Sequence, residues 1–206
     1  MVQPTGDFKE YLPYITLGAP DPFIGVGGFI DVETTGLSPS LDEVIELAII
    51  LFAFNRKTGQ ITGIIEDYTG LREPSIPVSQ GAFGVHGITN TDLQGKSLDD
   101  CKILKMIEEA EFLVAHNANF DKAFVCKIYR QAAAKPWLCT MKGINWYRKG
   151  HRLRNLQYLL KAHGINGLTA HRAGSDVNGA LKLLTRTGPD GKSYFAELLE
   201  SKNKAV

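Results

Sequence analysis

The sequence lacks the long apolar run that a membrane-spanning helix requires, roughly 20 consecutive residues, and its apolar stretches are interrupted by polar side chains well before that length. The first ten residues have no basic start followed by an apolar segment, so we expect no secretory signal. Cysteine is scarce, because Cys101, Cys126 and Cys139 are the only three and show no C-x-x-C spacing. We therefore expect reduced thiols in a cytoplasmic protein without membrane contact.

A large net charge is also absent, since the formal value is +1. The charges are nevertheless unevenly distributed. Residues 1–103 carry 6 Lys and Arg against 14 Asp and Glu, whereas residues 104–206 carry 17 against 8. One surface of the folded chain is therefore expected to be basic and another acidic, which suits a polyanionic substrate held beside a carboxylate cluster. Chance asymmetry on a solvated surface is the alternative.

Proline and glycine concentrate in residues 1–26, so we expect an irregular N-terminal arm there and a single folded domain over residues 27–206. Apolar patterning predicts strands at residues 29–34, 44–55 and 60–68. Their short connections favour an antiparallel meander.

Helices and strands alternate after this meander. Thr89-x-x-Asp92 and Ser97-x-x-Asp100 resemble capping boxes at helix starts. Strands are expected at residues 112–116 and 137–141. The helix between these strands should bury Phe120, Ala123, Phe124 and Ile128. Two further helices are expected to close the chain. The first should bury Leu153, Leu156 and Leu160, and the second Val177, Ala180, Leu181 and Leu184. This order predicts a three-layer α/β domain with a mixed sheet.

Asp31 and Glu33 lie two residues apart in the first predicted strand, within Phe-Ile-Asp-Val-Glu-Thr-Thr-Gly. Residues i and i+2 of a strand project from the same face. Burying two like charges together is costly unless a cation neutralises them. Carboxylate oxygens suit Mg²⁺ or Mn²⁺ better than zinc. An exposed strand end without a metal is the alternative for this pair alone.

Two further acids lie near predicted helix starts. Asp121 follows His-Asn-Ala-Asn-Phe after the strand at residues 112–116, and Asp176 begins the last predicted helix. Helix capping explains either residue taken singly. His171 precedes Asp176 by five residues, and three other histidines, His86, His151 and His163, are interpreted as structural.

The three acidic segments, taken together, resemble the exonuclease motifs of the DEDDh family, the group that contains the proofreading exonuclease subunit of bacterial replicative DNA polymerase and ribonuclease T. The resemblance covers roughly residues 27–186, and residues 85–89 (Val-His-Gly-Ile-Thr) look like the family's connecting segment. It implies a ribonuclease H-like fold with a mixed five-stranded sheet, three strands antiparallel and two parallel, flanked by helices.

The resemblance also implies a 3′→5′ exonuclease that uses two Mg²⁺ ions, or Mn²⁺, to hydrolyse phosphodiester bonds and release nucleoside 5′-monophosphates. Asp31, Glu33, Asp121 and Asp176 would hold the metals, and His171 would act as the general base. The residues expected to contact the substrate are Thr34, Thr35, Gly36, Leu37, His116, Asn117 and Phe120. For Leu37 and Phe120, an ordinary place in the core is the alternative.

The expected substrate is nucleic acid with a free 3′ end, with DNA favoured over RNA and single strands preferred. An enzyme that trims RNA with the same residues is one alternative, and a non-catalytic nucleic-acid-binding module is another. The arm and the tail after Gly188 are candidate contacts for a polymerase or repair partner. Residues 142–154 interleave basic and aromatic side chains, which is typical of a single-strand track but equally of a solvated loop and helix start.

Overall fold

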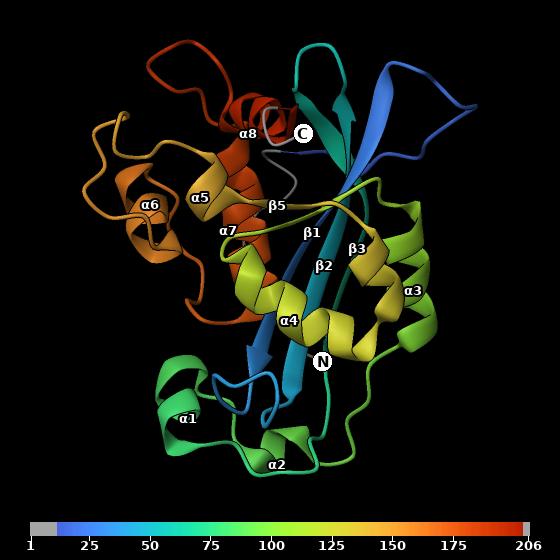
Figure 1. Ribbon diagram of the computed structural model, residues 1–206, viewed down its shortest axis with the longest axis vertical. Coiled ribbons are helices and arrows are strands. Elements are labelled where there is room, and N and C mark those ends of the chain that lie inside the picture. Colours follow the sequence, from blue (N-terminus) through green and yellow to red (C-terminus); the bar gives the residue numbers. More distant parts are fainter. Residues whose placement is uncertain (1–11, 204–206) are drawn as a thin grey trace.

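Five strands form one mixed sheet in the order β3-β2-β1-β4-β5 (Figure 1). The computed structural model describes residues 12–203. The strands are β1 Ile24–Thr34, β2 Val44–Asn55, β3 Ile61–Leu71, β4 Leu113–Ala115 and β5 Trp137–Cys139. Antiparallel pairing joins β1 to β2 and β2 to β3, and parallel pairing joins β1 to β4 and β4 to β5. The expected ribonuclease H-like sheet is therefore confirmed.

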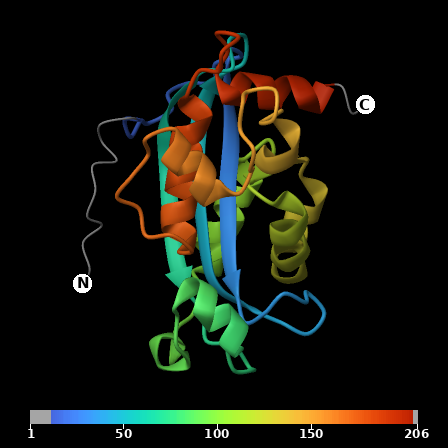
Figure 2. The ribbon, with the colours of Figure 1, turned by 90° about the vertical axis from the view of Figure 1, so that its left-hand side faces the viewer.

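Helices cover both faces of this sheet, which gives three layers (Figure 2). One face is covered by α7 and α8, and the other by α3 and α4. The helices are α1 Gln80–His86, α2 Asn90–Leu93, α3 Asp100–Glu109, α4 Ala118–Ile128, the 3-10 helix η2 Arg130–Ala134, α5 Thr140–Gly143, α6 Leu156–Ala162, α7 Ala173–Thr185 and α8 Tyr194–Asn203.

The side chains of β1 point alternately to the two faces of the sheet and so contribute to two separate layers of the core. Ile30 and Val32 pack with α3 and α4, whereas Phe29 packs with the α7 layer. Because side chains two apart share a face, Asp31 and Glu33 project with Phe29 toward α7. Both acids therefore lie on the face where α7 begins.

The first strand is longer than the sequence predicts. It begins at Ile24, so residues 24–26 belong to β1 and not to the irregular arm. Part of that arm also packs on the domain, since Leu12 is buried and Tyr14 forms a bridge with Ile64. Residues 1–11, the remainder of the predicted arm, lie outside the described residues.

The predicted capping box at Thr89 and Asp92 is confirmed, but the one at Ser97 is wrong. The side chain of Asp99 caps α3 instead, because it accepts a hydrogen bond from the backbone N–H of Lys102 at 3.0 Å. In α4 the buried positions include Val125, whereas Ala123 is exposed. The helix turns its apolar stripe slightly away from the predicted one.

The C-terminal part of the chain holds two helices that the sequence does not predict: α5, which begins inside the strand expected at residues 137–141, and α8. Leu153 is exposed and lies before α6, because Asn155 caps that helix. The helix that begins near Asp176 is not the last, since α8 follows it. Phe195 of α8 packs edge-on against Phe52 and Phe54, with ring centroids 5.3 and 5.2 Å apart. Part of the tail after Gly188, through Tyr194, Phe195 and Leu198, therefore belongs to the core.

Candidate active site

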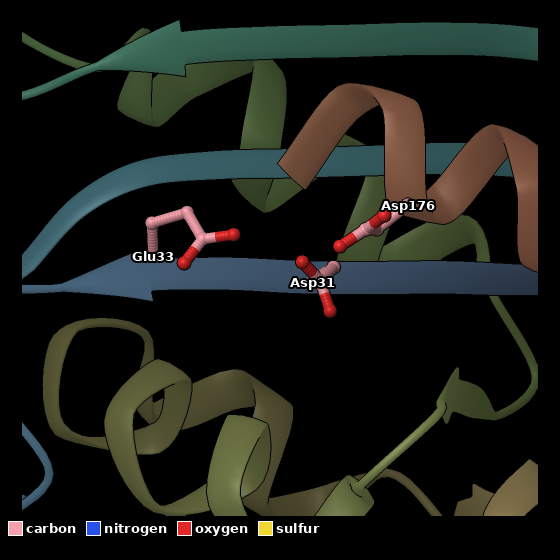
Figure 3. Close-up of side chains that lie close together, drawn as sticks. All are labelled: Asp31, Glu33 and Asp176. Atoms are coloured by element: carbon pink, nitrogen blue, oxygen red, sulfur yellow. The ribbon is translucent and has the colours of Figure 1, made fainter. Parts of the chain in front are cut away.

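Three carboxylates meet where β1 passes the beginning of α7. Asp31 and Glu33 come from β1 and Asp176 from the first turn of α7, and their side chains point toward one another in Figure 3. One oxygen from each lies within 4.8 Å of the others. Residues far apart in the sequence thus form one compact group of oxygen ligands.

Asp121 joins this group from the opposite side of β1. Its side chain is 2% exposed in the first turn of α4. Burial is the main cause of the raised pKa of Asp31, and the negative charge of Asp121 raises that pKa further. Asp121 thus influences the pKa of Asp31, although it is not one of the three acids whose oxygens lie within 4.8 Å of one another.

Burial is the main cause of unusual pKa values in all four acids. Desolvation, followed by the neighbouring negative charges, raises the pKa of Asp31 well above its usual range and that of Glu33 to about 8. Desolvation also raises the pKa of Asp121 to about 7 and that of Asp176 to about 6. Carboxyl groups with raised pKa values ionise less readily, and a cation beside them would favour their charged forms. The donor set of oxygens alone fits a hard divalent ion.

Glu46 is a fifth acid beside the cluster, and no local sequence pattern distinguishes it. It pairs with Glu33 across β1 and β2 and is only 2% exposed. Arg172 neutralises it, with Nη2 at 2.6 Å from Oε1 and Nε at 3.1 Å from Oε2. Its carboxylate also accepts the backbone N–H of Ala173 at 2.9 Å. Glu46 therefore fixes the beginning of α7 to the sheet.

His171 precedes Arg172 and lies at the edge of the cluster. Its side chain is exposed, and its backbone N–H donates to Oδ2 of Asp176 at 3.2 Å. The backbone has φ of 56°, a left-handed conformation that is uncommon for a residue other than glycine. Such local strain persists where surrounding contacts fix it. Gly174 and Ser175 already belong to α7, so the link between His171 and Asp176 is tight, contrary to the loose connection that the sequence suggests.

A pocket of about 420 Å³ adjoins Glu33 and collects four of the residues expected to hold substrate, Thr34, Gly36, Leu37 and Phe120. Leu37 is 85% exposed, which excludes the core position considered for it. Phe120 is half-buried and packs on Phe124. Gly36 has no room for a side chain, because a Cβ there would lie 2.6 Å from Oδ1 of Asp42.

The opposite wall of this pocket comes from α1, a helix that the sequence analysis did not predict. Its lining residues are Ser79, Gly81, Ala82, Val85 and His86. His86 donates from Nε2 to the carbonyl of Thr34 at 3.2 Å and accepts at Nδ1 from the N–H of Ile88. Its interpretation as structural therefore agrees with its contacts. Thr35 is fully buried and donates to Asp42, so its hydroxyl faces the protein.

His116 and Asn117 follow β4 and lead into α4. His116 is buried, and both of its ring nitrogens have protein partners, the hydroxyl of Thr140 and the carbonyl of Arg154, each at 2.8 Å. Burial lowers its pKa to about 4, so the ring is neutral. These contacts give His116 a structural role, and its expected contact with substrate stays a prediction. Asn117 is exposed at the start of α4.

Gln157 is a second contact that the sequence gave no reason to expect. Its side-chain amide donates to Oδ1 of Asp176 at 2.7 Å from the first turn of α6. With the N–H of His171 on the other oxygen, Asp176 has a hydrogen-bond donor on each side. The orientation of this carboxylate is therefore fixed before any metal binds.

Comparison with known proteins agrees with this site. A profile of the family described as Exonuclease (RNase T) matches residues 29–184, and the chain belongs to this family of nucleases. The chain is 31% identical over 157 residues to DNA polymerase III PolC-type of Thermotoga maritima, and 31% identical over 183 residues to that of Bacillus subtilis. These matches cover 71% and 83% of this chain, but only 10% and 12% of the polymerases. The chain spans about a tenth of the length of these relatives.

Solved structures show the same fold. Exonuclease X in complex with 5′ overhanging duplex DNA matches 87% of this chain and 92% of its own, with a TM-score of 0.54 and 24% identity. Exonuclease I of Escherichia coli in complex with a dT13 oligonucleotide matches 78% of this chain and 41% of its own, with a TM-score of 0.61 and 21% identity. Among residues 12–203, no helix is long and apolar enough to cross a membrane.

Proposed function

We propose that this nuclease removes nucleotides from the 3′ end of DNA, prefers single strands, and releases nucleoside 5′-monophosphates. The main support is that Glu33, a member of the carboxylate cluster, also lines a pocket whose walls include Leu37 and Phe120. A pocket of about 420 Å³ is at the small end of the size range for ligand sites. Relatives named as DNA polymerases and neighbours solved with DNA support DNA as the substrate.

The cofactor we propose is a pair of Mg²⁺ ions, for which Mn²⁺ can substitute. Asp31, Glu33, Asp121 and Asp176 would hold them. When bound, the cations neutralise the carboxylates and stabilise the negative charge that develops on the scissile phosphodiester. The hydrogen bonds from Gln157 and from the N–H of His171 keep Asp176 oriented for this role.

In this proposal the pocket orients the terminal nucleotide, and His171 accepts the proton of the attacking water. Leu37 and Phe120 would contact the terminal base, while backbone groups of the turn at residues 34–37 would hold the 3′-hydroxyl. A neutral imidazole at His171 would accept the proton of the attacking water. Histidine suits this step because its usual pKa lies near neutrality.

A digestion with end-labelled substrates tests this proposal. Matched single-stranded DNA, duplex DNA and RNA, each labelled at the 5′ end, are incubated with Mg²⁺, with Mn²⁺ and with a chelator. We expect a ladder that shortens from the 3′ end of single-stranded DNA, mononucleotide products, and no reaction in chelator. A circular single strand is the matched control, because it has no 3′ end. Its cleavage, or faster degradation of RNA than of DNA, would contradict the proposal.

We also propose that the chain acts beside a DNA polymerase. The support is that its relatives are regions within PolC-type DNA polymerase III chains. Comigration of the purified chain with a replicative polymerase in gel filtration is the expected outcome. Separate elution at micromolar concentrations of both proteins would count against this partner.

A further inference from the structure

The connection between α5 and α6 comprises residues 144–155. Near its C-terminal end, the chain makes hydrogen bonds to residues on both sides of the active site. The carbonyl of Arg154 accepts the hydrogen bond from His116, which precedes α4 and Asp121. Three residues later, Gln157 donates to Asp176 at the beginning of α7. In Figure 2, α6 and α7 lie on one side of β1 and α4 on the other. The end of this loop and the beginning of α6 therefore connect α4 and α7, the two helices that carry Asp121 and Asp176.

Two members of the basic and aromatic stretch serve to hold the loop in place. Trp146 is 1% exposed, and its indole N–H donates to the carbonyl of Thr140 at 2.8 Å. The Lys149 ammonium pairs with Glu197 at 2.7 Å and with Asp190 at 3.8 Å, and its side chain is 7% exposed. Neither is available to a ligand, so the stretch is not a uniform track.

The other basic side chains of the stretch face solvent. Lys142, Tyr147 and Arg154 line one hollow of about 320 Å³, and Arg152 is exposed two residues before Arg154. Among residues 12–203, no ion pair joins Lys142, Arg152 or Arg154 to an acid. Glu197 also lines the hollow, but Lys149 neutralises it. Unpaired cations and an exposed aromatic ring thus surround a concave surface beside the site.

We propose that this hollow, with Arg154 in its lining and the exposed Arg152 two residues away, binds the unpaired strand on the 5′ side of the nucleotide being removed. The inference rests on the proposed function and adds the surface that carries the rest of the substrate. Arginine and lysine neutralise backbone phosphates, and an aromatic face stacks on bases of any sequence. The fixed position of the Arg154 carbonyl on His116 holds this surface next to the acids.

The test compares Arg152→Gln/Arg154→Gln with the wild type in binding of fluorescent oligo(dT) of 2, 4, 8 and 12 nucleotides. Ca²⁺ replaces Mg²⁺ to suppress cleavage. We expect affinity for the longer strands to fall roughly 10–30-fold at 0.1 M salt, and the slope of log affinity against log salt to fall by about 1.4, since each phosphate contact on a single strand contributes about 0.7. The dinucleotide should be affected least, because it ends before the hollow.

Arg130→Gln is the matched control, because Arg130 is exposed and lies with Asp100 and Leu104 on another surface. Tyr147→Ala is the second variant, and we expect it to weaken binding of long strands without changing the salt slope. An unchanged affinity and slope in the double variant, with a wild type that binds and degrades the strand, would overturn the inference alone. A wild type that degrades no strand would instead overturn the proposed function.

Discussion

Glu46, which is buried, and the partly exposed Arg172 form an ion pair beside the proposed chemistry. The pair clamps the residue directly after His171, and Glu46 also accepts the first N–H of α7. His171 is therefore held between Arg172 and its own hydrogen bond to Asp176. We interpret Glu46 as a positioning residue for His171, acting through Arg172 and without touching substrate.

Glu46→Gln should slow turnover roughly tenfold while strand affinity in Ca²⁺ stays within about twofold. The amide keeps an acceptor for Ala173 but loses the charge that orders Arg172. Removing the base itself, in His171→Ala, should lower turnover about 10²–10⁴-fold. In the His171→Ala background, Glu46→Gln should have no further effect on turnover. Steady-state rates of the four proteins between pH 5.5 and 9 measure this coupling.

The matched control for that cycle is Arg56→Gln, which breaks another two-pronged arginine–carboxylate pair, with Glu111, at 2.6 Å on an exposed surface. We expect no change in turnover, since exposed pairs contribute about 0–1 kcal/mol. If Glu46→Gln slowed His171→Ala as much as the wild type, Glu46 would act on the metal ligands and not on His171.

At the residue scale, the sequence predicted the acids of the site but not their supports. Asp31 and Glu33 stand out because two acids interrupt an apolar strand at a spacing of two. Glu46 interrupts an equally apolar strand singly, and its partner lies 126 residues away. Gln157 is not marked by a local sequence pattern either, because its role depends on the hydrogen bond that it donates from α6 to Asp176 in α7. These supporting residues could not be predicted because local sequence patterns do not show contacts between distant segments.

The turn after β1 and the helix α1 form the two walls of the substrate pocket. Asp42 holds the turn by accepting hydrogen bonds from Thr35 and from the N–H of Ser38. The carbonyl of Thr35 accepts the N–H of Ser79, the residue that caps α1. The two walls are thus connected, and Leu37 projects from the turn with little contact of its own.

Leu37→Ala should weaken binding of single-stranded DNA about fivefold, since covering part of a leucine side chain is worth about 1 kcal/mol. Stability should change by less than about 0.5 kcal/mol, because an exposed side chain leaves no cavity. The matched control is Leu41→Ala, which removes a 75% exposed leucine from the same turn but on a different hollow. Affinity in Ca²⁺ and a thermal melt measure both quantities. Equal effects of the two substitutions would exclude a specific contact by Leu37.

At the element scale, prediction worked where an apolar pattern was continuous. The bounds of β2 follow the expected ones because nearly all of its side chains are buried. The helix α1 escaped prediction, since Gly81 and Gly84 lower its helical tendency and His86 is its only buried residue. The helix α8 was missed because the Gly- and Pro-rich residues 187–191 before it resemble the end of a domain. Its three buried side chains, Tyr194, Phe195 and Leu198, became informative only against the core.

The unequal charge of the two halves of the sequence has a counterpart in the whole molecule. The acidic half supplies β1, β2 and three acids beside the site, Asp31, Glu33 and Glu46. The basic half supplies the loop at residues 144–155 and the arginine that neutralises Glu46. The two halves pack together extensively, because β4 pairs with β1 and α7 packs on β1 and β2. The expected separation into a basic and an acidic surface stays a prediction.

The cluster should make the metal-free protein sensitive to pH. The pKa values of Glu33, Asp121 and Asp176 are about 8, 7 and 6 in the fold, all above their usual values near 4. A carboxyl whose pKa is raised by folding contributes stability that is present below its unfolded pKa and lost as pH rises through its folded pKa. The native state should therefore lose this contribution between about pH 4 and pH 8, when repulsion within the cluster develops.

Asp31→Asn removes one charge of the cluster and should relieve that repulsion. Without divalent cations, its melting temperature should equal that of the wild type near pH 5 and exceed it near pH 8, by about 2–4 °C for each kcal/mol relieved. Glu108→Gln is the control, since Glu108 is exposed on α3 outside the cluster. Mg²⁺ should then stabilise the wild type more than Asp31→Asn and reverse their order at pH 8, because a ligand that binds only the folded state stabilises it. A wild type that matches Asp31→Asn at both pH values, with no response to Mg²⁺, would show that the four acids neither repel one another nor hold a cation.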